Sequence, residues 1–226
     1  MRRPETNKKY EEFVKESDLT KILSNGLREL KLAQTIDDKQ QATLIKYVEL
    51  LDKWNKAYNL TAVRDPAQMV TRHILDSLSI CPYLRGKRVL DVGTGAGLPG
   101  IVLAIVFPER QFTLLDSNNK KTRFVTQAVS ELELSNVIVV QSRVENFHIP
   151  ELFDTITTRA YSAIGDMVNQ TSHLLASDGV FLAMKGTNPV AEIDGLPSNY
   201  QIEENHIIKV PGLNEERHLL EIRVIN

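Results

Sequence analysis

Two acidic residues flank a run of alternating glycines, and residues of these types at this spacing can bind a nucleotide. Asp91 stands two positions before Gly93, and Gly95 and Gly97 follow at alternate positions. Asp116 lies about twenty residues further along the chain. Glycine lets the backbone approach a ligand closely, and a carboxylate accepts hydrogen bonds from ammonium or hydroxyl groups. The pattern therefore favours recognition of a nucleoside-containing ligand.

A strand, a turn and a helix are needed to position these groups. The apolar run at 89–92 predicts a buried strand, and the pattern after the glycines predicts a helix over 98–107. A second strand is expected over 112–115, which places Asp116 at its end. Parallel strands bind ligands at their carboxyl ends, so both acids are expected beside the same ligand.

The segment GAGLPG at 95–100 matches the dinucleotide fingerprint GxGxxG, which makes a dehydrogenase one alternative. Three features count against it. An acid, Asp91, occupies a strand that is normally apolar in dinucleotide-binding proteins, and the glycines begin earlier, at Gly93. The chain also ends in a hairpin pattern typical of methyltransferase sheets. We therefore favour S-adenosylmethionine as the cofactor.

The parts of S-adenosylmethionine suit the residues available. Asp91 can accept hydrogen bonds from its amino group, and the glycine loop can fold around its methionine portion. Asp116 can accept both ribose hydroxyls, because a carboxylate has two oxygens. Val144 and Glu145, just past a third predicted strand, can bracket the adenine.

Strands and helices alternate after the glycine loop. Further strands are expected over 137–141, 153–157 and 180–184, with helices over 120–132 and 163–175. This alternation predicts an α/β fold, a Rossmann-like sheet with helices on both faces. Two β-rich runs, 200–210 and 217–225, are close in sequence and predict an antiparallel C-terminal hairpin. The expected sheet has seven strands, most of them parallel.

The region before the glycine loop is predicted to be helical. Helices are expected over 6–32, over 37–56 with Asp37 as its cap, and from Pro66 onwards. We expect them to cover an edge of the sheet. The predicted division is a helical cover over 1–80 and a cofactor-binding domain over 81–226.

Composition limits the classes of protein. The 226 residues carry a formal net charge of −2, so any polyanion must be bound by a local concentration of positive charge. The one cysteine excludes an internal disulfide and suits a reducing compartment. No apolar signal segment opens the chain, and no apolar run is long enough to cross a bilayer. We expect a cytoplasmic protein without membrane association.

Seven segments carry a resemblance to a known family. They are WNKAYNLTAVRD (54–65), RHILDSL (72–78), DVGTGAGLPGI (91–101), LLDSNNKK (114–121), SRVENF (142–147), TTRAYS (157–162) and LAMKG (182–186). Together they resemble the RsmG family, also called glucose-inhibited division protein B, from about residue 36 to the C-terminus. One departure is TRAY at 158–161, where the family usually has SRAF.

The resemblance implies methylation of guanine N7 in the 530 loop of bacterial 16S ribosomal RNA, with S-adenosylmethionine as methyl donor. It also implies the small ribosomal subunit as partner, and we expect the enzyme to be a monomer. The family's cofactor positions fall on Gly93, Leu98, Val144, Glu145 and Arg159. With the residues above, the predicted cofactor site comprises Asp91, Gly93, Thr94, Gly95, Gly97, Leu98, Asp116, Val144, Glu145 and Arg159.

The residues themselves agree with a ring nitrogen as acceptor. Methylation of pyrimidine carbon 5 needs a cysteine near the fourth or fifth strand, whereas Cys81 precedes the first and is expected to be buried. Exocyclic amines commonly require an N/D-P-P-aromatic segment, and TTRAYS contains no proline. Guanine N7 has an available lone pair, so its methylation needs in-line placement and no general base.

Arg159, at the end of the fourth strand, is the residue predicted to act at the chemical step, by binding the cofactor carboxylate or donating to guanine O6. The alternative is a structural ion pair with Asp91 or Asp116. RNA contacts are predicted for Arg64, Arg72, Arg143 and Lys185.

Other residues have structural alternatives that we weigh more heavily. Tyr58 and Tyr161 could stack on a base, although core packing is favoured for Tyr58. His73 is expected to be a polar helix residue, because the five histidines lack metal-ligand spacing. Two other functions remain open: methylation of a small molecule, and non-enzymatic binding of ribosomal RNA.

Overall fold

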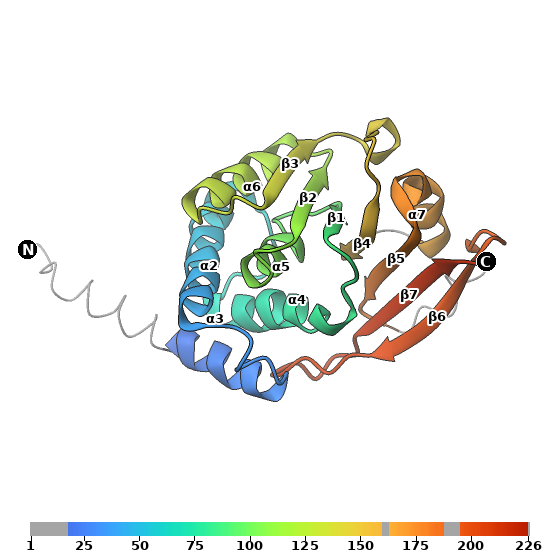
Figure 1. Ribbon diagram of the computed structural model, residues 1–226. Coiled ribbons are helices and arrows are strands. Elements are labelled where there is room, and N and C mark those ends of the chain that lie inside the picture. The colour runs from blue at the N-terminus through green and yellow to red at the C-terminus, as the bar shows by residue number, and fades with distance from the viewer. Residues whose placement is uncertain (1–17, 160–162, 188–194, 226) are drawn as a thin grey trace, which may run out of the picture.

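A seven-stranded sheet forms the centre of the computed structural model, which describes residues 18–159, 163–187 and 195–225 (Figure 1). The strand order is β3-β2-β1-β4-β5-β7-β6. Strands β1 to β5 run parallel, and β7 is inserted antiparallel between β5 and β6. The predicted fold is confirmed. The strands are β1 (Arg88–Val92), β2 (Gln111–Asp116), β3 (Val137–Gln141), β4 (Phe153–Arg159), β5 (Leu175–Lys185), β6 (Tyr200–Ile207) and β7 (His218–Val224).

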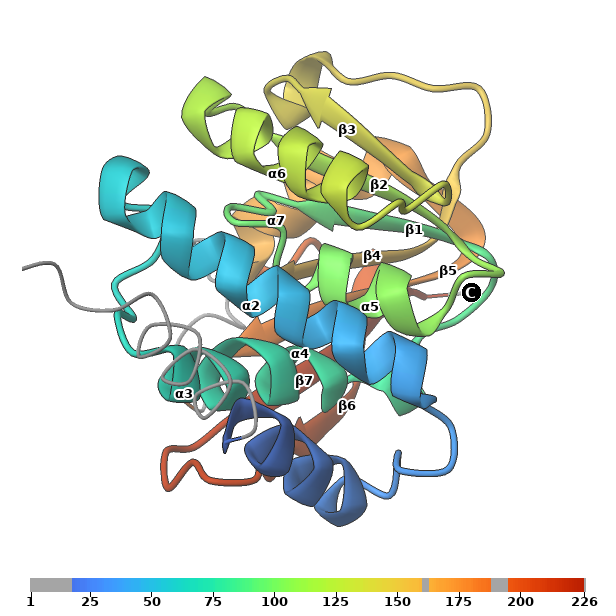
Figure 2. The same ribbon diagram turned by 90° about the vertical axis from the view of Figure 1, so that its left-hand side faces the viewer.

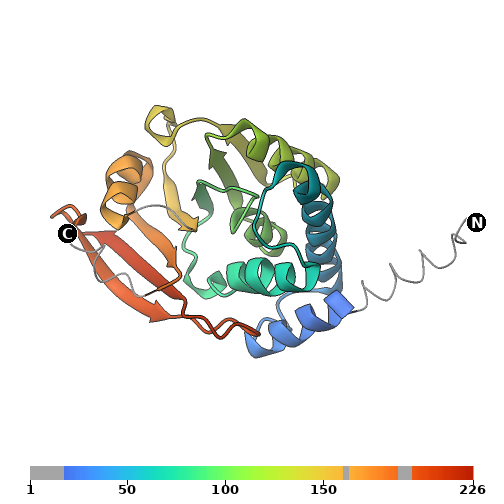
Figure 3. The ribbon, with the colours of Figure 1, turned by 180° about the vertical axis from the view of Figure 1, so that it is seen from behind.

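Helices cover both faces of the sheet. Figure 2 shows α2, α5 and α6 in front of the strands and α7 behind them. Seen from behind, α7 and the C-terminal hairpin lie on the side of the molecule opposite α2 and α6 (Figure 3). One buried apolar cluster joins the sheet to the front helices, and a second joins it to α7. The helices are α2 (Asp38–Tyr58), α3 (Pro66–Met69), α4 (Asp76–Leu78), α5 (Gly100–Val106), α6 (Asn119–Glu131) and α7 (Ile164–Thr171).

Helix α2 begins with the predicted cap and is joined directly to the helix that follows the glycine loop. The Asp37 carboxylate accepts a hydrogen bond from the Gln40 backbone N–H, and the Asp37 backbone N–H donates to Gln40 Oε1. Gln40 Nε2 also donates to the carbonyls of Ile105 and Val106, at 3.0 and 3.1 Å. These carbonyls end α5 and would otherwise lack helical partners. One glutamine therefore closes two helix ends.

The helix predicted from Pro66 is a composite run. Asp65 caps α3, and residues Val70–Leu75 then form a π-helical segment before α4. A π segment inserts an extra residue per turn, which changes the direction of the side chains after it. Arg72 and His73 both lie in this segment.

The connection into β5 corrects one prediction. The helix expected over 163–175 ends at Thr171, and a short turn, η4 (Ser172–Leu174), leads directly into the strand. Strand β5 starts at Leu175, five residues before the expected Val180, because Leu175 pairs with Phe153 before the register shifts. The sequence predicts no strand over 176–179, and tertiary pairing makes this segment part of β5.

The N-terminal part of the described chain shares a core with the sheet. Residues 18–29 are helical, and Leu23 and Leu27 belong to the same buried cluster as residues of α2 and α5. The proposed division between 1–80 and 81–226 remains a prediction. Among the residues described, no helix combines the length and apolarity required to span a bilayer.

Candidate active site

The glycine loop is tied to the end of β2 by its own backbone. The N–H groups of Gly93 and Thr94 both donate to the Leu115 carbonyl, at 2.8 and 3.0 Å. Gly97 adopts a φ of +90°, a region that residues with a side chain rarely occupy. The loop is thus held across the carboxyl ends of β1 and β2, as the sequence predicted.

One carboxylate oxygen of Asp91 anchors the glycine loop through two hydrogen bonds. Oδ2 accepts from Thr94 Oγ1 at 2.6 Å and from the Gly100 N–H at 2.9 Å. The side chain is fully buried, and its other oxygen, Oδ1, has no hydrogen-bond partner. Burial raises the pKa of Asp91 to about 6, although the bonds from Thr94 and Gly100 act in the opposite direction. An unpartnered buried carboxylate oxygen can accept a donor from a ligand.

Asp116 also binds the loop. Its Oδ2 accepts from the Gly95 N–H at 2.9 Å, and its Oδ1 accepts from the Asn118 N–H at 2.8 Å. A carboxylate has about four acceptor positions, so these two bonds leave capacity on both oxygens for hydroxyl donors. The carboxylate is largely buried, and it lines a groove at the sheet edge.

A tyrosine that the sequence analysis did not identify completes the support of the loop. Tyr47 of α2 is fully buried, and its hydroxyl donates to the Ala96 carbonyl at 2.6 Å. Burial strongly raises the pKa of this hydroxyl, so it remains a donor at neutral pH. Tyr47 is 49 positions from Ala96 and belongs to no glycine-loop motif, which explains why the pattern gave no signal.

A groove of about 260 Å³ lies at the carboxyl ends of β1, β2 and β3, and we call it the cofactor groove because the sequence predicts that the cofactor binds here. Its lining combines apolar, hydroxyl and charged side chains. The lining residues are Val92, Gly93, Leu115, Asp116, Ser117, Ser142, Arg143, Val144 and Glu145.

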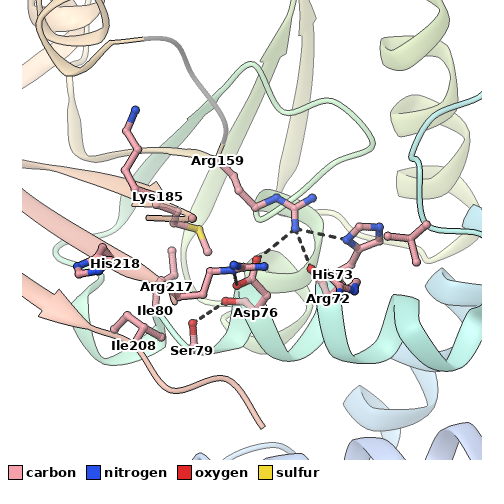
Figure 4. Close-up of a pocket in the computed structure, with 13 residues that line it drawn as sticks. Arg72, His73, Asp76, Ser79, Ile80, Arg159, Lys185, Ile208, Arg217 and His218 are labelled. Atoms are coloured by element: carbon pink, nitrogen blue, oxygen red, sulfur yellow. Dashed lines mark hydrogen bonds and ion pairs between the residues drawn. The ribbon is translucent and has the colours of Figure 1, made fainter. Parts of the chain in front are cut away.

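A second cavity, the arginine pocket, has a volume of about 370 Å³ (Figure 4). It lies between the composite helix 66–78, the ends of β4 and β5, and the start of β7. Its lining combines cationic and apolar side chains. The lining residues are Val63, Arg72, His73, Asp76, Ser79, Ile80, Arg159, Met184, Lys185, Gly186, Ile208, Arg217 and His218.

Asp76 is the anion at the floor of the arginine pocket. Its Oδ2 lies 3.4 Å from Arg159 Nη1, and its Oδ1 lies 3.2 Å from Arg217 Nε (Figure 4). Burial raises the pKa of Asp76, while Arg159 and Arg217 act to lower it. Arg159 Nη1 also donates to the Arg72 carbonyl at 3.2 Å. The carboxylate therefore fixes two arginines in one cavity, one at the end of β4 and one just before β7.

Comparison with known proteins identifies the family of a chain with these two cavities. A family model described as GidB, rRNA small subunit methyltransferase G, matches residues 40–220. The Stutzerimonas stutzeri protein named ribosomal RNA small subunit methyltransferase G is 53% identical over 195 residues, 85% of this chain and 91% of the relative. The Salmonella arizonae protein of the same name is 51% identical over 189 residues, 84% and 91% of the two chains. This chain belongs to the GidB family.

More distant structures share the fold of this GidB chain. A SAM-dependent methyltransferase from Aquifex aeolicus has a TM-score of 0.56 at 17% identity, covering 76% of this chain and 97% of its own. The glycopeptide N-methyltransferase MtfA, complexed with S-adenosyl-L-homocysteine, also has a TM-score of 0.56, at 12% identity, covering 68% and 87%. The predicted class of enzyme is confirmed by the family, and the predicted cofactor agrees with it.

The structure divides the predicted cofactor residues of this GidB protein among three places, the third of which holds Arg159 alone. Gly93, Asp116, Val144 and Glu145 line the cofactor groove. Others are placed behind the groove in the loop and its anchors, with side chains or backbone that hold its shape. These are Asp91, Thr94, Gly95, Gly97 and Leu98.

Arg159 departs from the predicted arrangement. It lines the arginine pocket and pairs with Asp76, rather than with Asp91 or Asp116, which the sequence analysis had considered as structural partners. The sequence could not suggest Asp76, because it lies 83 positions away on a helix. Arg217, on the other side of Asp76, was also missed, since it lies outside the motifs.

The predicted RNA-contact residues have different surroundings. Arg72 and Lys185 line the arginine pocket, whereas Arg143 lines the cofactor groove. Arg64 donates to the Asn55 carbonyl and the Asn59 side chain, at 3.1 and 2.7 Å. It therefore braces the end of α2.

Three further predictions have clear outcomes. Tyr58 is 41% exposed and stacks on Trp54, so the expectation that it packs in the core is wrong. Cys81 is buried, as predicted. His73 is a buried helix residue in contact with Thr61. Tyr161 lies outside the described residues.

Proposed function

We propose that this protein transfers a methyl group from S-adenosylmethionine to guanine N7 of 16S ribosomal RNA. The observation that carries the proposal is the presence of both a glycine-loop groove and a cationic cavity in a chain of the GidB family. Relatives more than 50% identical over most of the chain bear the name ribosomal RNA small subunit methyltransferase G.

The residues of the cofactor groove fit the chemical groups of S-adenosylmethionine. The unpartnered Oδ1 of Asp91 would accept from the ammonium, directly or through water. Asp116 would accept from the ribose hydroxyls, and Val144 and Glu145 would bracket the adenine. When bound, the cofactor supplies an electrophilic methyl group on its sulfonium.

Guanine N7 is the acceptor that places the smallest demand on the protein. Its lone pair is available, so no proton has to be removed and no general base is needed. The chain has one cysteine, and the Cys81 thiol is buried with its pKa raised to about 12, which leaves it unsuited to nucleophilic chemistry. The protein's contribution is then to hold the base in line with the sulfonium methyl.

Arg159 is the residue proposed to act on the acceptor. It comes from the carboxyl end of β4, beside the glycine loop, and Asp76 restrains its guanidinium. A planar guanidinium held in one orientation can donate two parallel bonds to a carboxylate, or it can donate to guanine O6, which leaves the N7 lone pair free to attack the methyl group. Arg64, Arg72, Arg143 and Lys185 are proposed to contact RNA. We place the enzyme in the cytoplasm as a monomer.

The decisive experiment is methyl transfer to ribosomal RNA from cells that lack the enzyme. The purified protein is incubated with labelled S-adenosylmethionine and small subunits or extracted 16S RNA, and the modified position is mapped by nuclease digestion and mass spectrometry. We expect label on guanine N7 and its loss in Arg159→Met. Label on any other atom would contradict the N7 assignment. Absence of label from every ribosomal RNA would contradict the proposed substrate.

A further inference from the structure

The lining of the arginine pocket carries more cationic than acidic side chains. Arg72, Arg159, Arg217 and Lys185 line it, and Asp76 is the acidic residue among its lining side chains. Asp76 contacts Arg159 and Arg217, whereas Arg72 pairs with Glu215. A cavity of this charge attracts an anionic ligand.

Arg72 is held by a carboxylate that lies outside the lining of the pocket. Its Nη1 and Nη2 donate to the two oxygens of Glu215, at 3.0 and 2.6 Å. Arg217 Nη2 donates to the same carboxylate at 3.1 Å. Glu215 thus receives three hydrogen bonds from two arginines that come from the π-helical segment and from the start of β7.

This arrangement is the one by which arginine recognises phosphate. A guanidinium presents the same fork of N–H groups to a carboxylate and to a phosphate, and two guanidiniums directed at one anion add to its charge neutralisation. The Glu215 side chain is 48% exposed, and it follows the turn that connects β6 to β7. An exposed ion pair contributes little to stability, so exchange of the Glu215 carboxylate for another anion costs little free energy.

We propose that Arg72 and Arg217 form a binding site for a phosphodiester of the RNA strand, and that the Glu215 carboxylate occupies this site until RNA displaces it. The inference rests on the proposed function, because it requires RNA as the substrate. The apolar lining from Ile80, Met184 and Ile208 lies beside the site and provides a surface for the attached nucleoside. Arg159, on the opposite side of Asp76, remains available for the acceptor base.

Glu215→Gln tests the displacement. Removing the carboxylate charge frees the two arginines without removing either of them, so the variant is expected to bind RNA about two- to fivefold more tightly, the gain expected from releasing an exposed ion pair. Binding is measured with a fluorescent fragment of unmethylated 16S RNA, and the KM of methyl transfer is measured with small subunits. The KM is expected to fall by a similar factor.

Glu216→Gln is the matched control. Glu216 is adjacent in sequence, its side chain is 70% exposed, and its carboxylate lies near His218 rather than the two arginines. The substitution changes net charge by the same amount. Equal tightening in the two variants would assign the effect to general charge and overturn the proposal.

A double-mutant cycle identifies the partner of the displaced carboxylate. Arg72→Gln is expected to weaken RNA binding and to lower the slope of log Kd against log salt concentration by about 0.7 to 1, the loss of one phosphate contact. In the Arg72→Gln background, Glu215→Gln is expected to give at most half of the gain in RNA affinity that it gives in the wild type, because one of the two arginines is gone. A full gain in the absence of Arg72 would overturn the proposal.

The test separates this inference from the proposed function. Thermal melting of each variant establishes that it is folded, and Glu215→Ala provides a second removal of the carboxylate with the same expected result. If the wild-type enzyme methylates guanine N7 and neither Glu215 variant binds RNA more tightly, the phosphate site is refuted and the function stands. If the wild type neither binds nor methylates 16S RNA, both proposals fail.

Discussion

Replacing Asp91 by asparagine should stabilise the protein increasingly as the pH rises, while weakening the cofactor site. Burial raises the pKa of Asp91 from 3.8 to about 6. In that interval the folded state binds a proton that the unfolded chain has already lost, so the free energy of unfolding decreases as pH increases. The difference between 3.8 and about 6 corresponds to about 3 kcal/mol, which is lost in full above the folded pKa. Asparagine is neutral throughout and escapes this cost.

The asparagine amide introduces a smaller, pH-independent cost. Its carbonyl oxygen can replace Oδ2 as acceptor for Thr94 and Gly100, but its NH₂ then occupies the position of Oδ1, where the structure has no hydrogen-bond partner. An unsatisfied buried donor costs about 1–3 kcal/mol. The variant should therefore be less stable than the wild type in acid and equal or more stable at pH 7.

Urea unfolding at a series of pH values measures this difference. From the linkage relation, the stability of Asp91→Asn relative to the wild type should rise by about 2 kcal/mol between pH 4.5 and 7.5. Taking the difference cancels the titration of other groups. Asp18→Asn, whose side chain is 64% exposed, is the matched control. A difference between Asp91→Asn and wild type that does not change with pH would refute the reasoning.

The same samples test the function of the carboxylate. A ligand that binds only the folded state stabilises it by RT ln(1 + L/Kd), where L is the free ligand concentration. S-adenosylmethionine should raise the melting temperature of the wild type, and Asp91→Asn should require at least about tenfold more cofactor for the same rise, a cost of about 1.4 kcal/mol. Equal stabilisation of both proteins would exclude Asp91 from the cofactor site.

Three further substitutions test the supports of the two cavities. Tyr47→Phe leaves the buried Ala96 carbonyl without its donor, so it should cost about 1–3 kcal/mol of stability and weaken cofactor binding. Tyr58→Phe, at an exposed ring, should do neither. Urea unfolding measures the stability and isothermal titration the cofactor binding. Gly100→Ala places a Cβ in steric overlap with Leu114 Cδ2 and 2.7 Å from Asp91 Oδ2, so it should lower stability by about 1–3 kcal/mol. Gly195→Ala, whose Cβ would have its nearest contact at 3.8 Å, should be nearly neutral in the same unfolding experiment. Burial lowers the pKa of His73 to about 4. Between about pH 6.5 and pH 4 the imidazole is therefore neutral in the folded protein and protonated in the unfolded chain, so stability is lost as the pH falls through this range. His73→Gln should remove this acid-side loss, and an unchanged pH profile of unfolding would contradict the assignment.

Local patterns in the sequence were enough to predict the sheet and the cofactor groove. A strand, three glycines and a helix are consecutive in the chain, so their geometry depends on short-range preferences of the backbone. Asp116, Val144 and Glu145 follow later strands, and parallel strands end at the same edge, which brought them to the groove without knowledge of their contacts. The cap of α2 by Asp37 was likewise predicted, because capping depends on neighbours within one turn.

Only the tertiary structure decided which side chains support the groove and how the second cavity is built. Tyr47 reaches Ala96 across 49 positions, Arg217 reaches Asp76 across 141, and Arg72 reaches Glu215 across 143. Each of these contacts depends on the packing of the composite helix or α2 against the sheet, and a single sequence contains no period or spacing that reports it. The placement of Asp116, Val144 and Glu145 at one sheet edge was therefore predictable from the chain, whereas the anions that hold Arg72 and Arg159 required the folded molecule.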